Sequence, residues 1–363
     1  TYTLLLELPG YFPWEEKVII RPNEVVNIGP VYLFKQSTPQ LKTALPSSNA
    51  FLSSPNKQTL LLPEKNQVRF INVVDSTDVT VPVSGQKELQ ARWSANNEWV
   101  VINEEFILDQ KGQKVLDFKD ITPYSPTFLR WDSNQSHLLF FESKQILYNI
   151  NVITKKVTEE LDLRPLLVSR QLVDYQPHGR QIYFVFTGNQ ESELVTLSPD
   201  TPNKQNTAVL PQGRYRFMPL LDNRILLLET NHRLVYRIDQ PLPLFLAPRI
   251  TAVASSYTTG RWTNDTLLYV TPLEIRQWNN NEEKLIGRLS EAVIDVIFVP
   301  ERQAILVATP TNLIVWPLTN QPFAKTTSLV SDSKIQELLE VTHSTIQFRG
   351  EVNGQSGVFT LDY

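Results

Sequence analysis

An arginine followed by a tryptophan occurs three times in the chain, and each pair stands just before a polar turn that leads into an apolar strand. The pairs are Arg92-Trp93, Arg130-Trp131 and Arg261-Trp262. On a functional interpretation, Arg92, Arg130 and Arg261 converge from separate strands and bind an anion or a carboxylate bidentately. On a structural interpretation, each tryptophan packs in the core and its arginine stacks on it or pairs with a neighbouring carboxylate. Asp174, which precedes Tyr175 at the corresponding position, is a candidate partner, and both interpretations stay open.

A cluster of aromatic residues near the start of the chain is the second candidate binding element. The segment reads Tyr11-Phe12-Pro13-Trp14. Aromatic rings of this kind contact polysaccharide or protein partners when they are exposed. The alternative is that they pack within their own module. Tyr11 and Trp14 are therefore further candidate binding residues.

The residues needed for most kinds of catalysis are missing or scattered. No cysteine is present, which excludes disulfides, thiolate metal sites and cysteine nucleophiles. The four histidines lack zinc-ligand spacing and are expected in exposed loops: His137, His178, His232 and His343. Nucleophile elbow, P-loop and dinucleotide motifs are absent, and Asp132-Ser133-Asn134 lacks the glycine and distal glutamate of a calcium loop. We expect a protein that is not an enzyme and has no cofactor or metal.

The charge of the chain argues against nucleic acid as a partner. Its 34 basic and 38 acidic residues give a net charge of −4, and both signs are scattered along the sequence. No basic stripe is available to neutralise phosphates.

The elements that must position these residues are short strands that repeat. Eight apolar runs each follow a polar turn: Thr59–Leu62, Trp99–Ile102, His137–Phe141, Gln181–Phe186, Arg224–Leu228, Thr266–Val270, Ala304–Val307 and Thr345–Phe348. The turns at Ser53–Lys57, Trp93–Asn97 and Trp131–Gln135 align without gaps. Trp93 and Trp131 are 131 − 93 = 38 residues apart, and Trp131 and Tyr175 are 175 − 131 = 44 residues apart. A period near 40 with about four strands per unit predicts an all-β fold, a β-propeller over residues 37–363.

The two ends of the repeat predict how the propeller closes. The last unit stops one strand short after Ser356–Leu361, while Leu41–Leu45 is a spare strand before the first unit. Pairing of these two segments completes the last blade and leaves no exposed sheet edge. This count favours eight blades, with seven blades and one irregular unit as the alternative.

The turn pattern, an aromatic residue, a Ser, Asp or Thr and a polar pair before an apolar strand, resembles TolB-like and WD40-like propeller repeats. The glycine of the usual turn survives only at Gly179, and no unit has the His and Trp-Asp signature of true WD40 repeats. The resemblance implies the fold and no particular partner.

Residues 1–36 do not fit the repeat, and they resemble the C-terminal half of a PEGA domain, a small β-sandwich module. The matching pieces are the strand before Pro9-Gly10-Tyr11, the strand Lys17–Ile20, the segment Val25–Ile28 and the final Val31–Leu33. The resemblance implies a bacterial envelope protein outside the cytoplasm, tethered to the membrane by an upstream anchor. The lack of cysteine fits this location, and a cytoplasmic protein is the alternative.

These observations predict a non-enzymatic interaction scaffold whose propeller face binds an envelope protein or polysaccharide. Two alternatives stay open. One is a structural subunit of an oligomeric surface assembly, which predicts a large apolar patch. The other is a glycan-active or lactonase-type enzyme, which predicts acidic or histidine residues from several blades at one site.

Overall fold

The computed structural model describes most of the chain, in two units. The described residues are 1–28, 30–47, 51–75, 77–83, 89–121, 126–188, 191–218, 224–239, 248–263, 266–279, 282–318, 326–342 and 344–363, with backbone only at 262–263. The first unit is Thr1–Asn49 with Tyr257–Tyr363, and the second is Ala50–Ser256. The predicted boundary at residue 36 lies inside the first unit.

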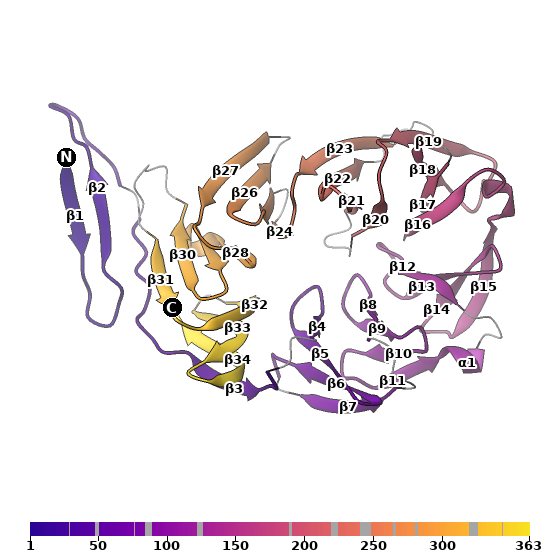
Figure 1. Ribbon diagram of the computed structural model, residues 1–363, viewed down its shortest axis with the longest axis horizontal. Helices are drawn as coiled ribbons and strands as arrows, with labels where there is room; N and C mark the ends of the chain where they lie inside the picture. The colour runs from indigo at the N-terminus through magenta and orange to yellow at the C-terminus, as the bar shows by residue number, and fades with distance from the viewer. Residues whose placement is uncertain are drawn as a thin grey trace. The chain divides into compact units, whose positions relative to one another are not determined.

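The second unit consists of five antiparallel sheets of four consecutive strands each (Figure 1). The strands are β4 (Leu52–Ser53), β5 (Thr59–Glu64), β6 (Gln67–Asn72) and β7 (Asp78–Pro82); β8 (Ala91–Trp93), β9 (Trp99–Ile102), β10 (Phe106–Asp109) and β11 (Lys114–Asp117); β12 (Thr127–Trp131), β13 (Leu138–Ser143), β14 (Ile146–Asn151) and β15 (Lys156–Asp162); β16 (Gln171–His178), β17 (Gln181–Thr187), β18 (Ser192–Leu197) and β19 (Gln205–Leu210); and β20 (Tyr215–Phe217), β21 (Ile225–Glu229), β22 (Leu234–Asp239) and β23 (Arg249–Ala254). A short helix, α1 (Phe118–Ile121), and a 3₁₀ turn, η1 (Arg164–Leu166), join consecutive sheets.

The first unit contains three further four-stranded sheets. Their strands are β24 (Thr259–Thr263), β25 (Thr266–Val270), β26 (Glu274–Asn279) and β27 (Glu282–Arg288); β28 (Asp295–Val299), β29 (Ala304–Ala308), β30 (Leu313–Pro317) and β31 (Thr327–Val330), with the 3₁₀ turn η2 (Pro300–Arg302); and β3 (Gln40–Ala44), β34 (Gln355–Asp362), β33 (Thr345–Val352) and β32 (Lys334–Val341). The described residues therefore form eight blade-like sheets, the all-β, eight-bladed propeller fold that the repeat predicts, and the seven-blade alternative is wrong.

All eight predicted apolar runs are the second strands of their sheets, and most of their side chains are buried. The core lies between successive sheets. Phe140 and Leu147 of one sheet, for example, pack against Tyr175 and Phe184 of the next. Because neighbouring sheets cover both faces of these strands, their sequences are continuous apolar runs and do not alternate between apolar and polar residues.

The polar turns before these strands repeat the same hydrogen bonds, as the gap-free alignment predicts. The Ser54 hydroxyl accepts from the Thr59 backbone N–H at 3.0 Å, and the Ser94 hydroxyl accepts from that of Trp99 at 3.0 Å. Asp132 takes the same place in the next sheet and accepts from the backbone of Asn134 at 2.7 Å. The corresponding predicted turn at Leu221–Asn223 lies outside the described residues.

The last sheet combines both ends of the repeat. β3 pairs antiparallel with β34, with Gln40 opposite Thr360 and Ala44 opposite Gly357. A Cβ atom on Gly357 would lie 2.3 Å from the Thr43 carbonyl oxygen, so the two backbones approach as closely as only glycine permits. The strand at residues 40–44 therefore supplies the fourth strand of this sheet. Closure of a ring of blades by this pairing stays a prediction.

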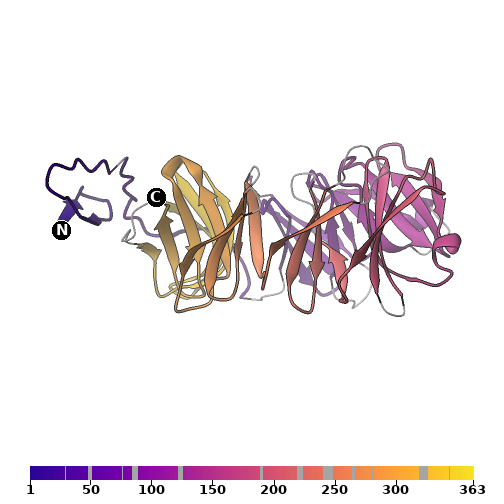
Figure 2. The same ribbon diagram turned by 90° about the horizontal axis from the view of Figure 1, so that it is seen from above.

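The segment before β3 is simpler than the PEGA resemblance implies. β1 (Tyr2–Leu6) and β2 (Trp14–Val18) form a hairpin, and Tyr11 and Lys35 form an isolated bridge. The described residues 25–28 and 31–33 form no strand. Figures 1 and 2 both show the hairpin outside the sheets of the first unit. The described residues 1–36 therefore form a hairpin and an isolated bridge, and a PEGA-like module stays a prediction.

Candidate interaction site

Arg130 connects three consecutive sheets of the second unit through one carboxylate. The first strands of these sheets, β12, β16 and β20, lie beside one another. The Arg130 guanidinium donates to Oδ1 of Asp174 at 2.5 Å, and Oδ2 of Asp174 accepts from the backbone N–H of Phe217 at 2.8 Å. Asp174 is buried and also accepts from the N–H of Tyr175 at 2.8 Å. The buried charge is thus paired and hydrogen-bonded on both oxygens.

The first unit repeats this arrangement with different residues. Arg261 in β24 donates to Oδ2 of Asp295 in β28 at 3.0 Å, and the same oxygen accepts from the backbone N–H of Leu338 in β32 at 3.2 Å. Oδ1 of Asp295 accepts from the N–H of Val296 at 2.9 Å, just as Asp174 does from its own neighbour. An arginine, an aspartate and a backbone amide on three successive first strands therefore form a recurring link.

Arg92 in β8 occupies the corresponding position but lacks the corresponding partner. Its nearest carboxylate is that of Glu104, with 4.0 Å between Arg92 Nη2 and Glu104 Oε1, and its side chain is 35% exposed. Burial lowers the pKa of Arg92, and the positive charge of Arg130 lowers it further. Since β8 and β12 lie side by side, the two guanidinium groups come from neighbouring sheets.

The pairing with a neighbouring carboxylate that the structural interpretation allows is observed for two of the three arginines. Arg130 pairs with Asp174, the partner that the sequence suggests, and Arg261 pairs with Asp295. The Trp131 indole packs in the core and donates to the Arg92 carbonyl at 2.7 Å. Arg92 and Arg130 lie near each other within the second unit, whereas Arg261 belongs to the first. A binding role for these arginines stays a prediction.

The aromatic cluster Tyr11 and Trp14 lies at the hairpin of the first unit. Both side chains are half-buried, and Trp14 is opposite Leu6 in the strand pair. The following chain is fastened by Arg302, which donates to the Leu33 carbonyl at 3.0 Å and to that of Tyr363 at 3.2 Å. Its guanidinium also lies over the rings of Phe34 and Tyr363. These contacts of Arg302 hold residues 33–37 against the last sheets, and the β1–β2 hairpin precedes this segment in the chain.

His178 is more structured than an exposed loop position implies. His178 is half-buried, its Nδ1 shares a 2.6 Å hydrogen bond with the Ser133 hydroxyl, and burial lowers its pKa. This hydrogen bond of the Ser133 hydroxyl links two neighbouring sheets. Ser133 is 1% exposed, so its hydroxyl is not accessible to a substrate. The prediction of an exposed loop is wrong for His178, and His343 lies outside the described residues.

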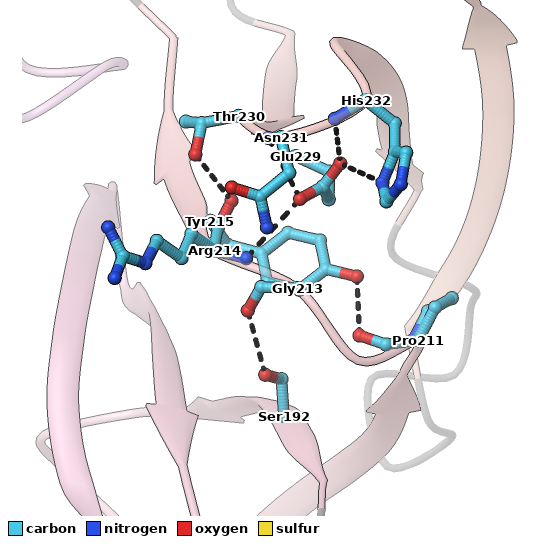
Figure 3. Close-up of polar contacts among 9 residues, drawn as sticks. All are labelled: Ser192, Pro211, Gly213, Arg214, Tyr215, Glu229, Thr230, Asn231 and His232. Carbon is cyan, nitrogen blue, oxygen red and sulfur yellow. Dashed lines mark hydrogen bonds and ion pairs between the residues drawn. The ribbon is translucent and has the colours of Figure 1, made fainter.

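His232 marks a buried carboxylate that the sequence gives little reason to single out. Glu229 at the end of β21 accepts hydrogen bonds from the backbone N–H groups of His232 at 2.7 Å, Asn231 at 3.0 Å and Arg214 at 3.3 Å (Figure 3). The exposed imidazole of His232 lies 3.1 Å from the same carboxylate. Burial raises the pKa of Glu229, but these hydrogen bonds outweigh it and hold the pKa below its ordinary value of 4.5.

Gly213 has no Cβ atom and therefore leaves the space that the Glu229 side chain occupies. A Cβ atom at Gly213 would lie 2.7 Å from Cγ and 2.9 Å from Oε1 of Glu229. The Tyr215 hydroxyl donates to the Pro211 carbonyl at 2.6 Å, which holds the segment beneath it (Figure 3). The cluster fixes the turn between β21 and β22.

Other kinds of site find no support in the part of the chain that the structure describes. No group of three or more histidine, aspartate or glutamate side chains is arranged to hold a metal there. No helix there is long and apolar enough to cross a bilayer.

Comparisons with known proteins support the fold and assign no family. No protein-family model and no curated protein matches the chain. A solved structure described as a eukaryotic initiation factor is 13% identical, with 90% of this chain and 94% of that chain covered and a TM-score of 0.50. The Dos1 propeller (11% identical, 91% and 95% covered, TM-score 0.49) and the WD40 domain of SCAP from fission yeast (8%, 90% and 94%, 0.46) are further similar structures. At 13% identity, the first of these structures shows likeness of fold alone.

Proposed function

We propose that this protein is a non-enzymatic interaction scaffold that binds a partner protein through the β1–β2 hairpin. The observation that carries the proposal is the exposure of β1. All five of its residues are exposed, among them Tyr2 at 60% and Leu5 at 59%. Leu4, Leu6 and Leu8 are exposed as well, and the side chains of Tyr2, Leu4 and Leu6 share one face of the strand. Contiguous apolar surface of this kind marks interaction sites in soluble proteins.

The hairpin needs a further contact for physical reasons. Two-stranded hairpins are marginally stable in water, and β1 pairs only with β2 among the described residues. A strand added at the edge of β1 would satisfy its free backbone groups and cover its leucines, which is the usual mode of β-strand addition. We therefore propose that the partner contributes an extended apolar segment that lies along β1.

The location in this proposal follows from the resemblance of residues 1–36 to a PEGA domain. We propose that the protein lies on the outer side of a bacterial cytoplasmic membrane, tethered to that membrane, with an envelope protein as its partner. The cysteine-free composition supports the same location.

Affinity capture followed by a direct binding measurement tests the proposal. The wild-type chain captures proteins from solubilised envelope membranes and separately from cytosol, and the dissociation constant of each purified captured protein is then measured. We expect an envelope protein whose binding weakens at least tenfold in Leu5→Glu, because the charge would be buried against the added strand. Val168→Glu changes an exposed aliphatic residue in the second unit and serves as the matched control.

Two outcomes would overturn parts of this proposal. A partner found only in cytosol would overturn the envelope location. Self-association of the wild-type chain in light scattering, abolished by Leu5→Glu, would replace the scaffold with a subunit of an oligomeric assembly.

A further inference from the structure

The strand that should supply a carboxylate to Arg92 has none. Arg130 finds Asp174 on the next first strand, β16, and Arg261 finds Asp295 on the next first strand, β28. The first strand that follows β8 is β12, with the sequence TFLRW and no acidic residue. The link between an arginine and an aspartate therefore forms at Arg130 and at Arg261. At Arg92 the next first strand supplies no carboxylate.

The guanidinium groups of Arg92 and Arg130 each keep an N–H donor for which the described residues offer no acceptor. The Nε atoms of Arg92 and Arg130 are buried and have no hydrogen-bond partner among the described residues. The 4.0 Å between Arg92 and Glu104 is too long for a hydrogen bond. Arg92 and Arg130 contribute two positive charges, which face the buried carboxylate of Asp174 and the more exposed carboxylate of Glu104 at 4.0 Å from Arg92. An added anion would relieve the repulsion between the two cations.

We propose that Arg92 and Arg130 form a binding site for a carboxylate of a partner protein, which takes the place that Asp174 and Asp295 fill in the other two links. This inference rests on the proposed function. Arginine holds carboxylates through paired N–H donors, so an acidic side chain of the partner can bridge the two strands. The Arg92 side chain is about one-third exposed, which leaves it open to such a ligand.

Small anions share the chemistry of a carboxylate, so the test includes both sources. Calorimetric titration at low ionic strength uses four probes: an acetylated and amidated triglutamate peptide, its triglutamine counterpart, glutarate and inorganic phosphate. We expect the triglutamate peptide to bind and the triglutamine peptide not to bind. Arg92→Gln should weaken triglutamate binding at least tenfold.

Arg180→Gln is the matched control, because Arg180 is an exposed arginine in the same unit and its loss changes the net charge equally. Arg92→Lys keeps the charge without the forked donors and should weaken binding severalfold, which keeps the test informative if Arg92→Gln does not fold. Equal binding of triglutamate by wild type and both Arg92 variants would overturn the site. If glutarate or phosphate binds as tightly as the triglutamate peptide, the ligand of this site is a free anion and not the side chain of a partner protein. The Leu5→Glu result is independent of each of these outcomes, so the proposed function fails or stands separately.

Discussion

The carboxylate of Asp174 accepts a hydrogen bond from the backbone N–H of Phe217 across the boundary between two sheets. Because the same side chain holds the Arg130 guanidinium on its other side, one buried aspartate connects three sheets. Asp295 does the same in the first unit, with Leu338 as the amide donor. Each aspartate therefore connects three successive first strands.

Removal of the Asp174 carboxylate should destabilise the second unit strongly. Asp174→Ala leaves Arg130 and the Phe217 amide without their acceptor, and breaking a buried ion pair costs about 3–5 kcal/mol. We expect a clear fall in the urea midpoint of unfolding, with a smaller fall for Asp174→Asn, which keeps an acceptor oxygen. Asp200→Ala removes an exposed carboxylate and should leave the midpoint unchanged. A midpoint for Asp174→Ala equal to that of the control would contradict the linking role.

A methyl group at Gly213 should displace the Glu229 carboxylate. The new Cβ atom would lie 2.7 Å from Cγ of Glu229, and the three backbone amides that hold the carboxylate prevent it from moving freely. Overpacking of this kind costs about 1–3 kcal/mol. Thermal unfolding should show Gly213→Ala to be less stable than Gly188→Ala, whose Cβ has its nearest contact at 3.7 Å. Equal midpoints of thermal unfolding for the two variants would show that the cluster does not need glycine at position 213.

The Glu229 carboxylate should also make stability depend on pH in the acid range. Its folded-state pKa lies below the ordinary value of 4.5, so its hydrogen bonds stabilise the fold fully above pH 4.5. This stabilisation is lost as the pH falls below 4.5 through the folded-state pKa. Urea midpoints of wild type and Glu229→Gln from pH 7 to pH 3 should therefore converge on the acid side. A constant difference over the whole range would show that Glu229 does not titrate with folding.

Much of this architecture is predictable from the sequence because burial on both faces leaves a strong signal. The eight apolar strands, the turns at Ser54 and Ser94 and the pairing of residues 40–44 with the last strand all follow from residue types. The final strand expected at 31–33 is not formed, because an apolar pattern does not reveal whether a pairing strand is present.

The candidate site was predictable only in part. Asp174 was recognisable as a partner of Arg130, since a charged residue within an apolar strand needs an opposite charge. The amides of Phe217 and Leu338 were not, because a backbone donor has no signature in the residue type. The Ser133–His178 and Glu229 clusters depend on which turns meet across sheets, and sequence spacing does not encode that either.

Gly357 offers a test of the strand pair that joins the two ends of the repeat. A Cβ atom there would lie 2.3 Å from the Thr43 carbonyl oxygen, so Gly357→Ala should force β3 away from β34. Hydrogen exchange of the amides in residues 40–44 should become at least tenfold faster, while Gln355→Ala, an exposed position on the same strand, should leave it unchanged. Undiminished protection in Gly357→Ala would mean that β3 stays paired with β34 and that the pairing does not require glycine at position 357.

The pairing of β3 with β34 also has a consequence during synthesis. Gln40 and Thr360 are 360 − 40 = 320 residues apart, so β3 leaves the ribosome long before its partner exists. At about 5–20 residues per second, the delay is roughly 16–64 s. Throughout that time a nascent chain with several finished sheets presents an unmatched strand near its beginning. The step that completes this sheet therefore cannot precede the synthesis of β34, and a holdase that shields residues 40–44 would act on the chain within this interval.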